Sequence, residues 1–100
     1  MVVVEVFRDK KEIKEITISG HAKYDKIGRD IVCASASSIA ITSVNLAIKV
    51  DDTAITYRDD DGYLKIDILN NKLNYIFENM IDMLYELSED YPSNIKIKEK

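Results

Sequence analysis

The stretch from Ile31 to Lys49 is apolar or small at almost every position. A helix of this kind has no polar face to turn towards water, so we expect it to be central and largely buried. Asp30, directly before it, is a residue type that caps helix N-termini. A chain of 100 residues has enough surface to bury for one hydrophobic core but not for two. We therefore expect residues 1–100 to form a single domain around this helix.

Strand-like segments, in which β-branched and polar residues alternate, stand on both sides of this helix. The expected strands are residues 2–8, 13–20, 53–58, 63–69 and 93–98. A second helix, capped by Asn70 or Asn71 and closed by Pro92, carries apolar residues at 3- and 4-residue spacing. Asp61-Gly62 supplies the positive φ of a tight hairpin. The order ββαββαβ predicts a two-layer α+β domain with two helices packed on a mixed or antiparallel sheet.

Charge and composition disfavour several classes of partner. The formal net charge is −4, so the usual electrostatic basis for binding nucleic acid or an anionic membrane is missing. Polar residues interrupt the apolar run from Ile39 to Ile48, and the N-terminus has no cationic lead, so we expect no transmembrane segment and no signal peptide. The single cysteine excludes an intrachain disulfide and a multi-cysteine metal site, and it fits a reducing cytoplasm.

The chain has one histidine, His21, and one cysteine, Cys33. Such residues are more often structural than catalytic when nothing else is known. Cys33, however, falls in the expected first turn of the helix, where unpaired N–H groups and the helix dipole favour a thiolate. His21 stands at the mouth of the loop that leads into this turn. The pair is therefore a candidate nucleophile and general base for attack on a carbonyl.

Neighbouring groups could complete this site. The backbone N–H groups of Val32 and Cys33 would face a developing oxyanion. Asp30 caps the helix first and could also orient His21. Ser37 lies one turn after Cys33 on the same face, where its hydroxyl could bind the pair or the substrate, although spacing alone favours close packing on the sheet.

The segment from His21 to Arg29 shows neither the helical nor the strand period. Gly20 and Gly28 bracket it and would let it hinge. We therefore expect a loop that is mobile without substrate and ordered with it.

Two other patterns are weaker. The turn Asp59-Asp60-Asp61-Gly62 resembles the start of a calcium loop, but an EF-hand loop that began at Asp59 would need an oxygen ligand at Tyr63 and a Glu where Asn70 stands. A solvated turn is therefore expected. Met and aromatic residues of the second helix could line a ligand groove, but their spacing favours ordinary packing. These residues are Tyr75, Phe77, Met80, Met83 and Tyr85.

The run from Gly20 to Ala34, GHAKYDKIGRDIVCA, resembles the signature of the ribosomal-processing cysteine protease family, Prp. The family's G-H-A, a Tyr shortly after it, a Gly and D-I-V-C-A all have counterparts, with the family's spacing from His21 to Cys33. The match continues through Ser37 and Asn45. The length and the ββαββαβ order are similar too.

Two departures from the family pattern stand near the pair without touching it. Ile27 precedes Gly28 where the family more often has an aromatic or polar residue, and Ser35-Ala36 replaces a common Ala-Val. The first bears on how the loop closes.

The resemblance implies a homodimeric, cytoplasmic bacterial endopeptidase that removes an N-terminal extension from a large-subunit ribosomal protein. It implies a Cys-His dyad in which Cys33 is the nucleophile and His21 the base, with Asp30 and Ser37 as supporting residues. Loop residues Ala22, Tyr24 and Gly28 would belong to the segment that orders over the substrate. No metal, no cofactor, no direct nucleic-acid contact and no membrane are implied.

Two other functions compete with this one. A non-catalytic, ribosome-associated interaction module would bind a protein through its sheet edge or dimer surface and leave Cys33 inert. A redox-sensing thiol is disfavoured because the chain has no resolving cysteine. Rapid alkylation of Cys33 at neutral or mildly acidic pH would favour the protease, since a packed thiol reacts only on unfolding.

Overall fold

The structure is a computed structural model that describes residues 1–20, 29–60 and 62–100, with only the backbone described at Arg29 and Asp30. Strands and α-helices follow one another in the expected order ββαββαβ. The elements are β1 (Val2–Asp9), β2 (Glu12–Ser19), α1 (Arg29–Val50), β3 (Ile55–Asp60), β4 (Tyr63–Ile68), the short 3-10 helix η1 (Asn71–Leu73), α2 (Asn74–Asp90) and β5 (Ile95–Glu99). The predicted α+β class is confirmed.

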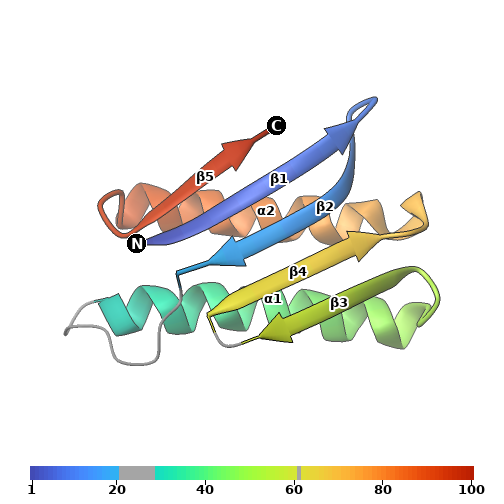
Figure 1. Cartoon of the computed structure of the whole chain (residues 1–100), viewed down its shortest axis with the longest axis horizontal. Helices are drawn as coiled ribbons and strands as arrows, with labels where there is room; N and C mark the ends of the chain where they lie inside the picture. Colours follow the sequence, from blue (N-terminus) through green and yellow to red (C-terminus); the bar gives the residue numbers. More distant parts are fainter. Residues whose placement is uncertain (21–28, 61) are drawn as a thin grey trace.

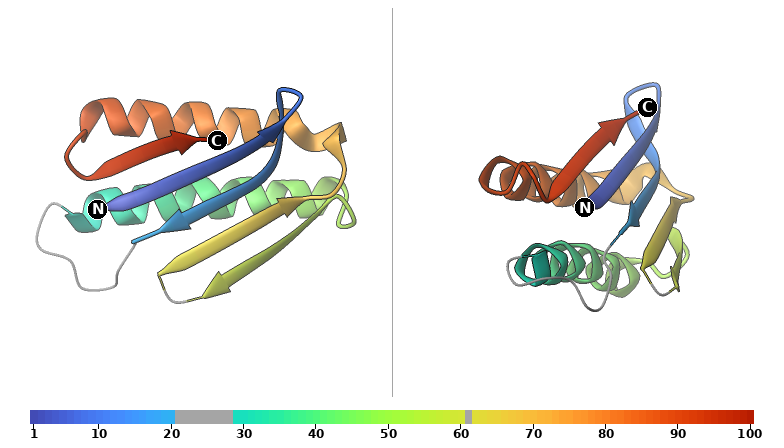
Figure 2. Two further views of the ribbon diagram at one scale, coloured as in Figure 1. Left: turned by 45° about the horizontal axis from the view of Figure 1, so that its top comes forward. Right: turned by 60° about the vertical axis from the view of Figure 1, so that its left-hand side comes forward.

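The strands form one mixed sheet in the order β3-β4-β2-β1-β5. β5 runs parallel to β1, and the other neighbouring strands are antiparallel. Both helices lie side by side on one face of this sheet, which makes two layers (Figure 1, Figure 2). β3 and β5 are therefore the two edge strands.

Local backbone chemistry explains the hairpins. Lys10 and Lys11 both have positive φ, 52° and 71°, as a two-residue type I′ turn between paired strands requires. Gly62 has φ 79° with open space around it, which confirms the positive φ expected there. Asn70 caps η1, because its side chain accepts a hydrogen bond of 2.9 Å from the Lys72 amide. The 3-10 turn thus precedes α2, which begins at Asn74.

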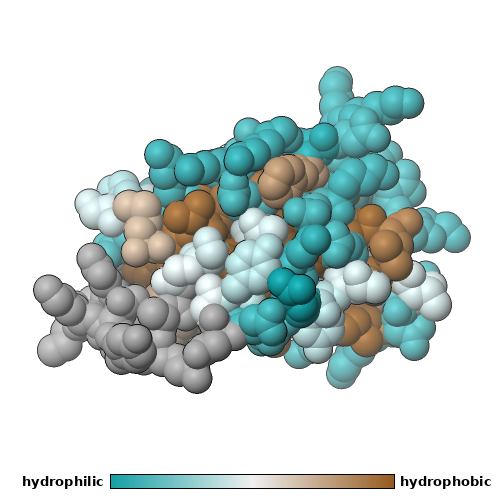
Figure 3. Space-filling view, in the orientation of Figure 1, coloured by the Kyte–Doolittle hydropathy of each residue, from teal (hydrophilic) through white to brown (hydrophobic). Residues whose placement is uncertain are grey.

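The core lies between the sheet and the two helices. Alternate residues of β1 and β4 are buried, as the strand period predicts, whereas in β2 Ile16, Thr17 and Ile18 are buried in succession. The α2 side chains that close the core are Ile76, Phe77, Met80, Ile81 and Leu84. The opposite face of the sheet is largely hydrophilic, with scattered apolar patches (Figure 3).

Helix α1 is less buried than its composition predicts. One stripe packs on the sheet, at Val32, Cys33, Ala36, Ala40, Ser43, Val44 and Ala47. Outside this stripe Ile31 is 56% exposed, Leu46 49% and Val50 55%. The expectation of a largely buried helix is therefore wrong, because a two-layer fold provides a sheet on one side of α1 and leaves the other side uncovered.

By length and composition alone, the 20 residues from Ile31 to Val50, with a mean hydropathy of 1.8, could cross a membrane. The helices buried in protein cores meet the same criterion. Packing against the sheet accounts for the apolar residues of the buried stripe but not for Ile31, Leu46 and Val50, which are exposed. The expectation of no transmembrane segment stays a prediction.

Candidate active site

Cys33 lies near the N-terminal end of α1, on the stripe that faces the sheet. Its side chain is buried, with 9% exposed, and belongs to the hydrophobic core. Because α1 begins at Arg29, Cys33 is one turn inside the helix and not within the first turn after a cap at Asp30. In regular helix geometry the amides of Val32 and Cys33, the fourth and fifth residues of α1, both pair with carbonyls four residues earlier, so the unpaired amides belong to the residues before Val32.

Asp30 is thus a helical residue and not the N-cap that the sequence predicted. The reason is that the helix starts at Arg29, two residues before the apolar run that begins at Ile31. A carboxylate in the first turn still favours helix formation through the helix dipole. Its side chain lies outside the described part of the structure, so its expected role as an orienter of His21 stays a prediction.

Several of the predicted site residues lie outside the described residues. They are His21, Ala22, Tyr24 and Gly28, together with the expected mobility of their loop. What the structure does place is where this segment begins and ends: after Gly20, at the end of β2, and before Arg29, at the start of α1. Both points lie at the same end of the molecule (Figure 1).

Gly20 is required for a close approach of two backbones. Its φ is 84°, and a side chain there would collide with the carbonyl oxygen of Met1. The Gly20 amide donates a hydrogen bond of 3.1 Å to the carbonyl of Gly62. The chain therefore leaves β2 beside the β3–β4 turn, at a position that only glycine can occupy without strain.

Ser37 lies one turn after Cys33, as expected, and is half-buried. It lines a cavity of about 40 Å³ between α1 and the sheet, together with Ile18, Ala40, Ile41, Asp59 and Leu64. Within the described part of the chain the Ser37 hydroxyl makes no hydrogen bond. The hydroxyl of Ser43, by contrast, donates a hydrogen bond of 2.9 Å to the carbonyl of Ile39. Ser37 is thus a polar group that lines a small cavity, one helical turn after the candidate nucleophile.

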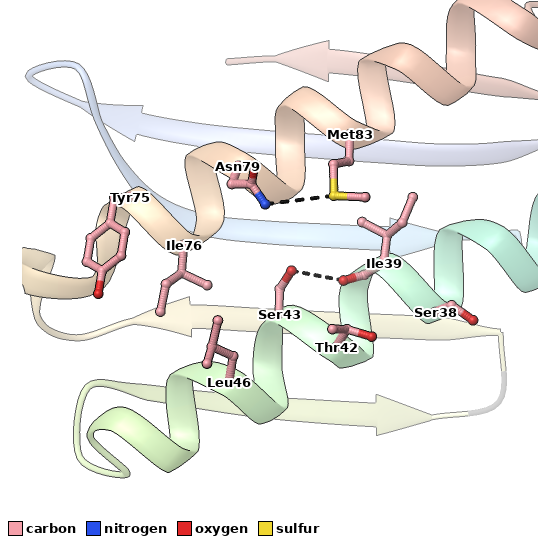
Figure 4. A pocket seen from close by; sticks show the side chains of 9 residues that line it. All are labelled: Ser38, Ile39, Thr42, Ser43, Leu46, Tyr75, Ile76, Asn79 and Met83. Atoms are coloured by element: carbon pink, nitrogen blue, oxygen red, sulfur yellow. Dashed lines mark hydrogen bonds between the residues drawn. The ribbon is translucent and has the colours of Figure 1, made fainter.

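A larger groove runs between α1 and α2 on the side away from the sheet (Figure 4). Its volume is about 610 Å³, and its walls include Ile39, Leu46, Tyr75, Ile76 and Met83. Tyr75 is 65% exposed and Met83 43%. The sequence interpretation, which assigned the aromatic and Met residues of α2 to ordinary packing, is correct for Phe77 and Met80 but misses these two. Helical spacing cannot show whether the neighbouring helix, α1, covers these two side chains.

A cluster of hydrogen-bonded charged side chains lies on β1, α2 and β5, none of which carries Cys33. Arg8 of β1 bonds both carboxylate oxygens of Glu78, at 2.7 and 3.0 Å, and one of Glu99, at 2.8 Å. The hydrogen bond from Arg8 holds the pKa of Glu99 below its ordinary value, and a second one from Tyr85 adds to this effect. This cluster joins β1, α2 and β5, so it is a structural element and not part of the candidate site.

The described residues contain no group of three or more His, Cys, Asp and Glu side chains arranged to hold a metal ion. The groups that the described residues offer near this end of α1 and at the cavity are the thiol of Cys33, the hydroxyl of Ser37, backbone amides at the start of α1 and the carboxylate of Asp59. A thiol beside the end of a helix can act as a nucleophile towards a carbonyl.

Comparison with known proteins connects this arrangement with a chemistry. A family model described as Cysteine protease Prp matches residues 1–96. A Staphylococcus aureus protein named ribosomal processing cysteine protease Prp is 31% identical over 106 residues, which cover 100% of both chains.

Two crystal structures of the S. aureus Prp protease are similar to this chain over 100% of both chains. The one in complex with a substrate peptide has a TM-score of 0.92 at 27% identity. The other, in complex with a covalently linked product peptide, has a TM-score of 0.81 at 30% identity. The similarity therefore extends over the whole fold and includes relatives whose structures hold a peptide.

Proposed function

The chain belongs to the cysteine protease Prp family, and on that premise we propose that it removes an N-terminal extension from a large-subunit ribosomal protein. One observation carries the assignment of the site. A cysteine protease needs a thiol nucleophile, and Cys33 is the only cysteine in the sequence. The covalently linked product peptide in the S. aureus relative supports a covalent intermediate in this chemistry.

In the proposed reaction His21, the only histidine in the sequence, accepts the thiol proton of Cys33. The thiolate then forms a bond to the scissile carbonyl carbon. As the C–N bond breaks, His21 gives the proton to the leaving amine, and an acyl-enzyme remains on the sulfur. Water, deprotonated by His21, hydrolyses this thioester and restores the thiol. Backbone amides at the start of α1, next to Val32 and Cys33, would stabilise the oxyanion.

The remaining predicted residues support this pair. Asp30, one turn before Cys33 in α1, would orient His21 and stabilise its protonated form. Ser37 would hold the substrate beside the sulfur. Ala22, Tyr24 and Gly28 would belong to the segment that covers the bound peptide and excludes water from the thioester.

We also propose that the protein is a homodimer in the cytoplasm, with the groove between α1 and α2 as its interface. Exposed apolar side chains gather there, among them Leu46, Tyr75 and Met83, and such patches mark interaction sites. Replacement of Leu46 by lysine is expected to give monomers in sedimentation experiments, because it would bury a charge at the interface. A wild-type protein that sediments as a monomer at high concentration would contradict this assembly.

Cleavage of a synthetic peptide from the N-terminus of the host's ribosomal protein tests the function. Cys33→Ala and His21→Ala should each abolish cleavage while the thermal midpoint stays close to that of the wild type. Ser93→Ala is the matched control, because Ser93 is exposed in the turn before β5 and lines neither the cavity beside Ser37 nor the groove between α1 and α2. Cleavage by Cys33→Ala at about a tenth of the wild-type rate would exclude the cysteine mechanism.

The burial of Cys33 favours one alternative, an interaction module in which the thiol is inert. Alkylation separates the two functions. Under the protease proposal iodoacetamide should modify native Cys33 rapidly at about pH 6–7. In this range a low-pKa cysteine is largely a thiolate, whereas an ordinary thiol is still protonated. Modification that requires unfolding would favour the module.

A further inference from the structure

We propose that the small cavity between α1 and the edge strand β3 binds a lysine or arginine side chain of the peptide substrate, with Asp59 as its charge partner. This inference rests on the proposed function. It deepens that function by naming the side-chain class that the site selects next to the scissile bond.

Sheet register places the Asp59 carboxylate on the side of the sheet that faces the helices. Asp59 pairs with Leu64, and Leu64 pairs with Ile18 on β2. Residues directly opposite one another in adjacent strands share a face, and both Leu64 and Ile18 are buried core residues. The carboxylate thus ends a row that the neighbouring strands fill with apolar side chains.

An inward-facing charge can itself protect an edge strand, but β3 does not depend on Asp59 for this protection. The outward-facing charges of β3 already provide it, because Arg58 and Asp60 form an ion pair of 2.9 Å with side chains 67% and 62% exposed. Asp59, by contrast, forms no ion pair with any residue in the described part of the chain. Its charge is therefore available to a ligand at the mouth of the cavity.

The cavity offers apolar and polar contacts to the outer atoms of a basic side chain, and its volume is too small for the whole side chain. Its walls are mainly apolar, and Ser37 and Asp59 add one hydroxyl and one carboxylate. A volume of about 40 Å³ corresponds to about three water molecules, since one needs roughly 10–15 Å³. Lysine and arginine lay an apolar stem along such walls and keep the charged end at a polar rim. Asp59 would pair with that charge, and Ser37 would accept one of its hydrogen bonds.

The distance to the nucleophile limits which substrate residue can occupy the cavity. Ser37 is four residues after Cys33, a rise of about 6 Å along the helix. An extended peptide advances about 3.3 Å per residue. The selected basic residue should therefore lie within about three residues of the scissile bond.

Peptide binding to the catalytically inactive Cys33→Ala protein tests the inference without interference from turnover. Each lysine or arginine within four residues of the cut is replaced in turn by norleucine, and the affinity is measured by fluorescence anisotropy. Asp59→Asn is expected to weaken binding of the basic peptide by about fivefold, the effect of one partly exposed charge pair of about 1 kcal/mol. Asp59→Asn should leave unchanged the affinity of the one norleucine peptide that lacks the basic residue bound in the cavity. Asp60→Asn, which removes the same charge from the other face of β3, should change neither affinity.

A charge swap gives a second readout. Asp59→Lys should bind a peptide with glutamate at the selected position more tightly than the parent peptide. If Asp59→Asn weakens the basic and norleucine peptides equally, or neither, the cavity is not a basic subsite. The proposed function would still stand in that case if wild-type cleavage depends on Cys33. Absence of Cys33-dependent cleavage would refute the function itself.

Discussion

The two edges of the sheet are built differently. At the β5 edge Ile95 is buried with 2% exposed, and Arg8, Glu78, Tyr85 and Glu99 connect β1, α2 and β5 by hydrogen bonds of 2.7–3.0 Å. At the β3 edge every residue after Ile55 is exposed. The only ion pair that the described residues form along β3 is the exposed one between Arg58 and Asp60.

This difference suits the β5 edge to stabilising the fold and the β3 edge to recognising a ligand. β5 is held by packing and charge from α2, so its position is fixed by several elements at once. β3 is held mainly by backbone pairing with β4, and its helix-facing side is open beside Ser37 and Asp59. The open edge is therefore suited to receive a peptide, while the closed edge keeps the sheet in place.

The largest expected difference between the edges comes from truncating one apolar side chain on each. Ile95→Ala should lower the free energy of unfolding by about 2–4 kcal/mol, because it leaves a cavity in the core. Tyr57→Ala on β3 should cost less than about 1 kcal/mol, because Tyr57 is 47% exposed. Urea denaturation measures both. Equal losses would show that the two edges are packed alike.

A smaller difference is expected from replacing one arginine on each edge. Arg8→Met should cost about 1–2 kcal/mol, because Arg8 has a side chain 27% exposed and bonds two carboxylates. Arg58→Met removes the same charge from a side chain that is 67% exposed and should cost less than about 0.5 kcal/mol. A loss for Arg58→Met as large as that for Arg8→Met would contradict the distinction between the edges.

The next effect depends on pH. The hydrogen bond from Arg8 lowers the pKa of Glu99 in the folded protein below its ordinary value of 4.5. The folded state therefore binds fewer protons than the unfolded state, so this stabilisation is complete above pH 4.5 and is lost as the pH falls through the lowered pKa. Between pH 5 and pH 3 the free energy of unfolding should fall less for Glu99→Gln than for the wild type. The difference between the two losses should be less than about 1 kcal/mol. Parallel denaturation curves would show that Glu99 does not contribute.

Most of the fold could be predicted from local patterns. The strand alternation and the Asp-Gly turn follow from single-residue preferences, and they placed the strands within a few residues. The parallel pairing of β1 with β5 could not be predicted as firmly, because it joins the two ends of the chain. The start of α1 was missed because Arg29 is polar and precedes the apolar run that marked the helix.

The candidate site was predicted only in part. His21 and Cys33 could be predicted because each is the only residue of its type in the sequence and because of the spacing between them. The sequence pattern instead indicates that Asp59 belongs to a solvated turn. Its placement depends on strand register, since a shift of one residue would have turned it to the outer face of the sheet. The exposed side of α1 was missed for a related reason. Composition shows how apolar a helix is but not whether another layer covers it.

The smallest expected effect on stability is that of Ser37→Ala, beside the open edge. The hydroxyl has no hydrogen-bond partner in the described part of the chain, and alanine is nearly its size, so the free energy of unfolding should change by less than about 0.5 kcal/mol. Cleavage should nevertheless fall, because a hydroxyl that positions the substrate contributes in the transition state. Ser43→Ala is the contrasting variant, because it removes a hydroxyl that already has a hydrogen-bond partner within the helix, the carbonyl of Ile39. Near-wild-type cleavage by Ser37→Ala would reduce Ser37 to packing and leave Asp59 as the only polar determinant of the cavity.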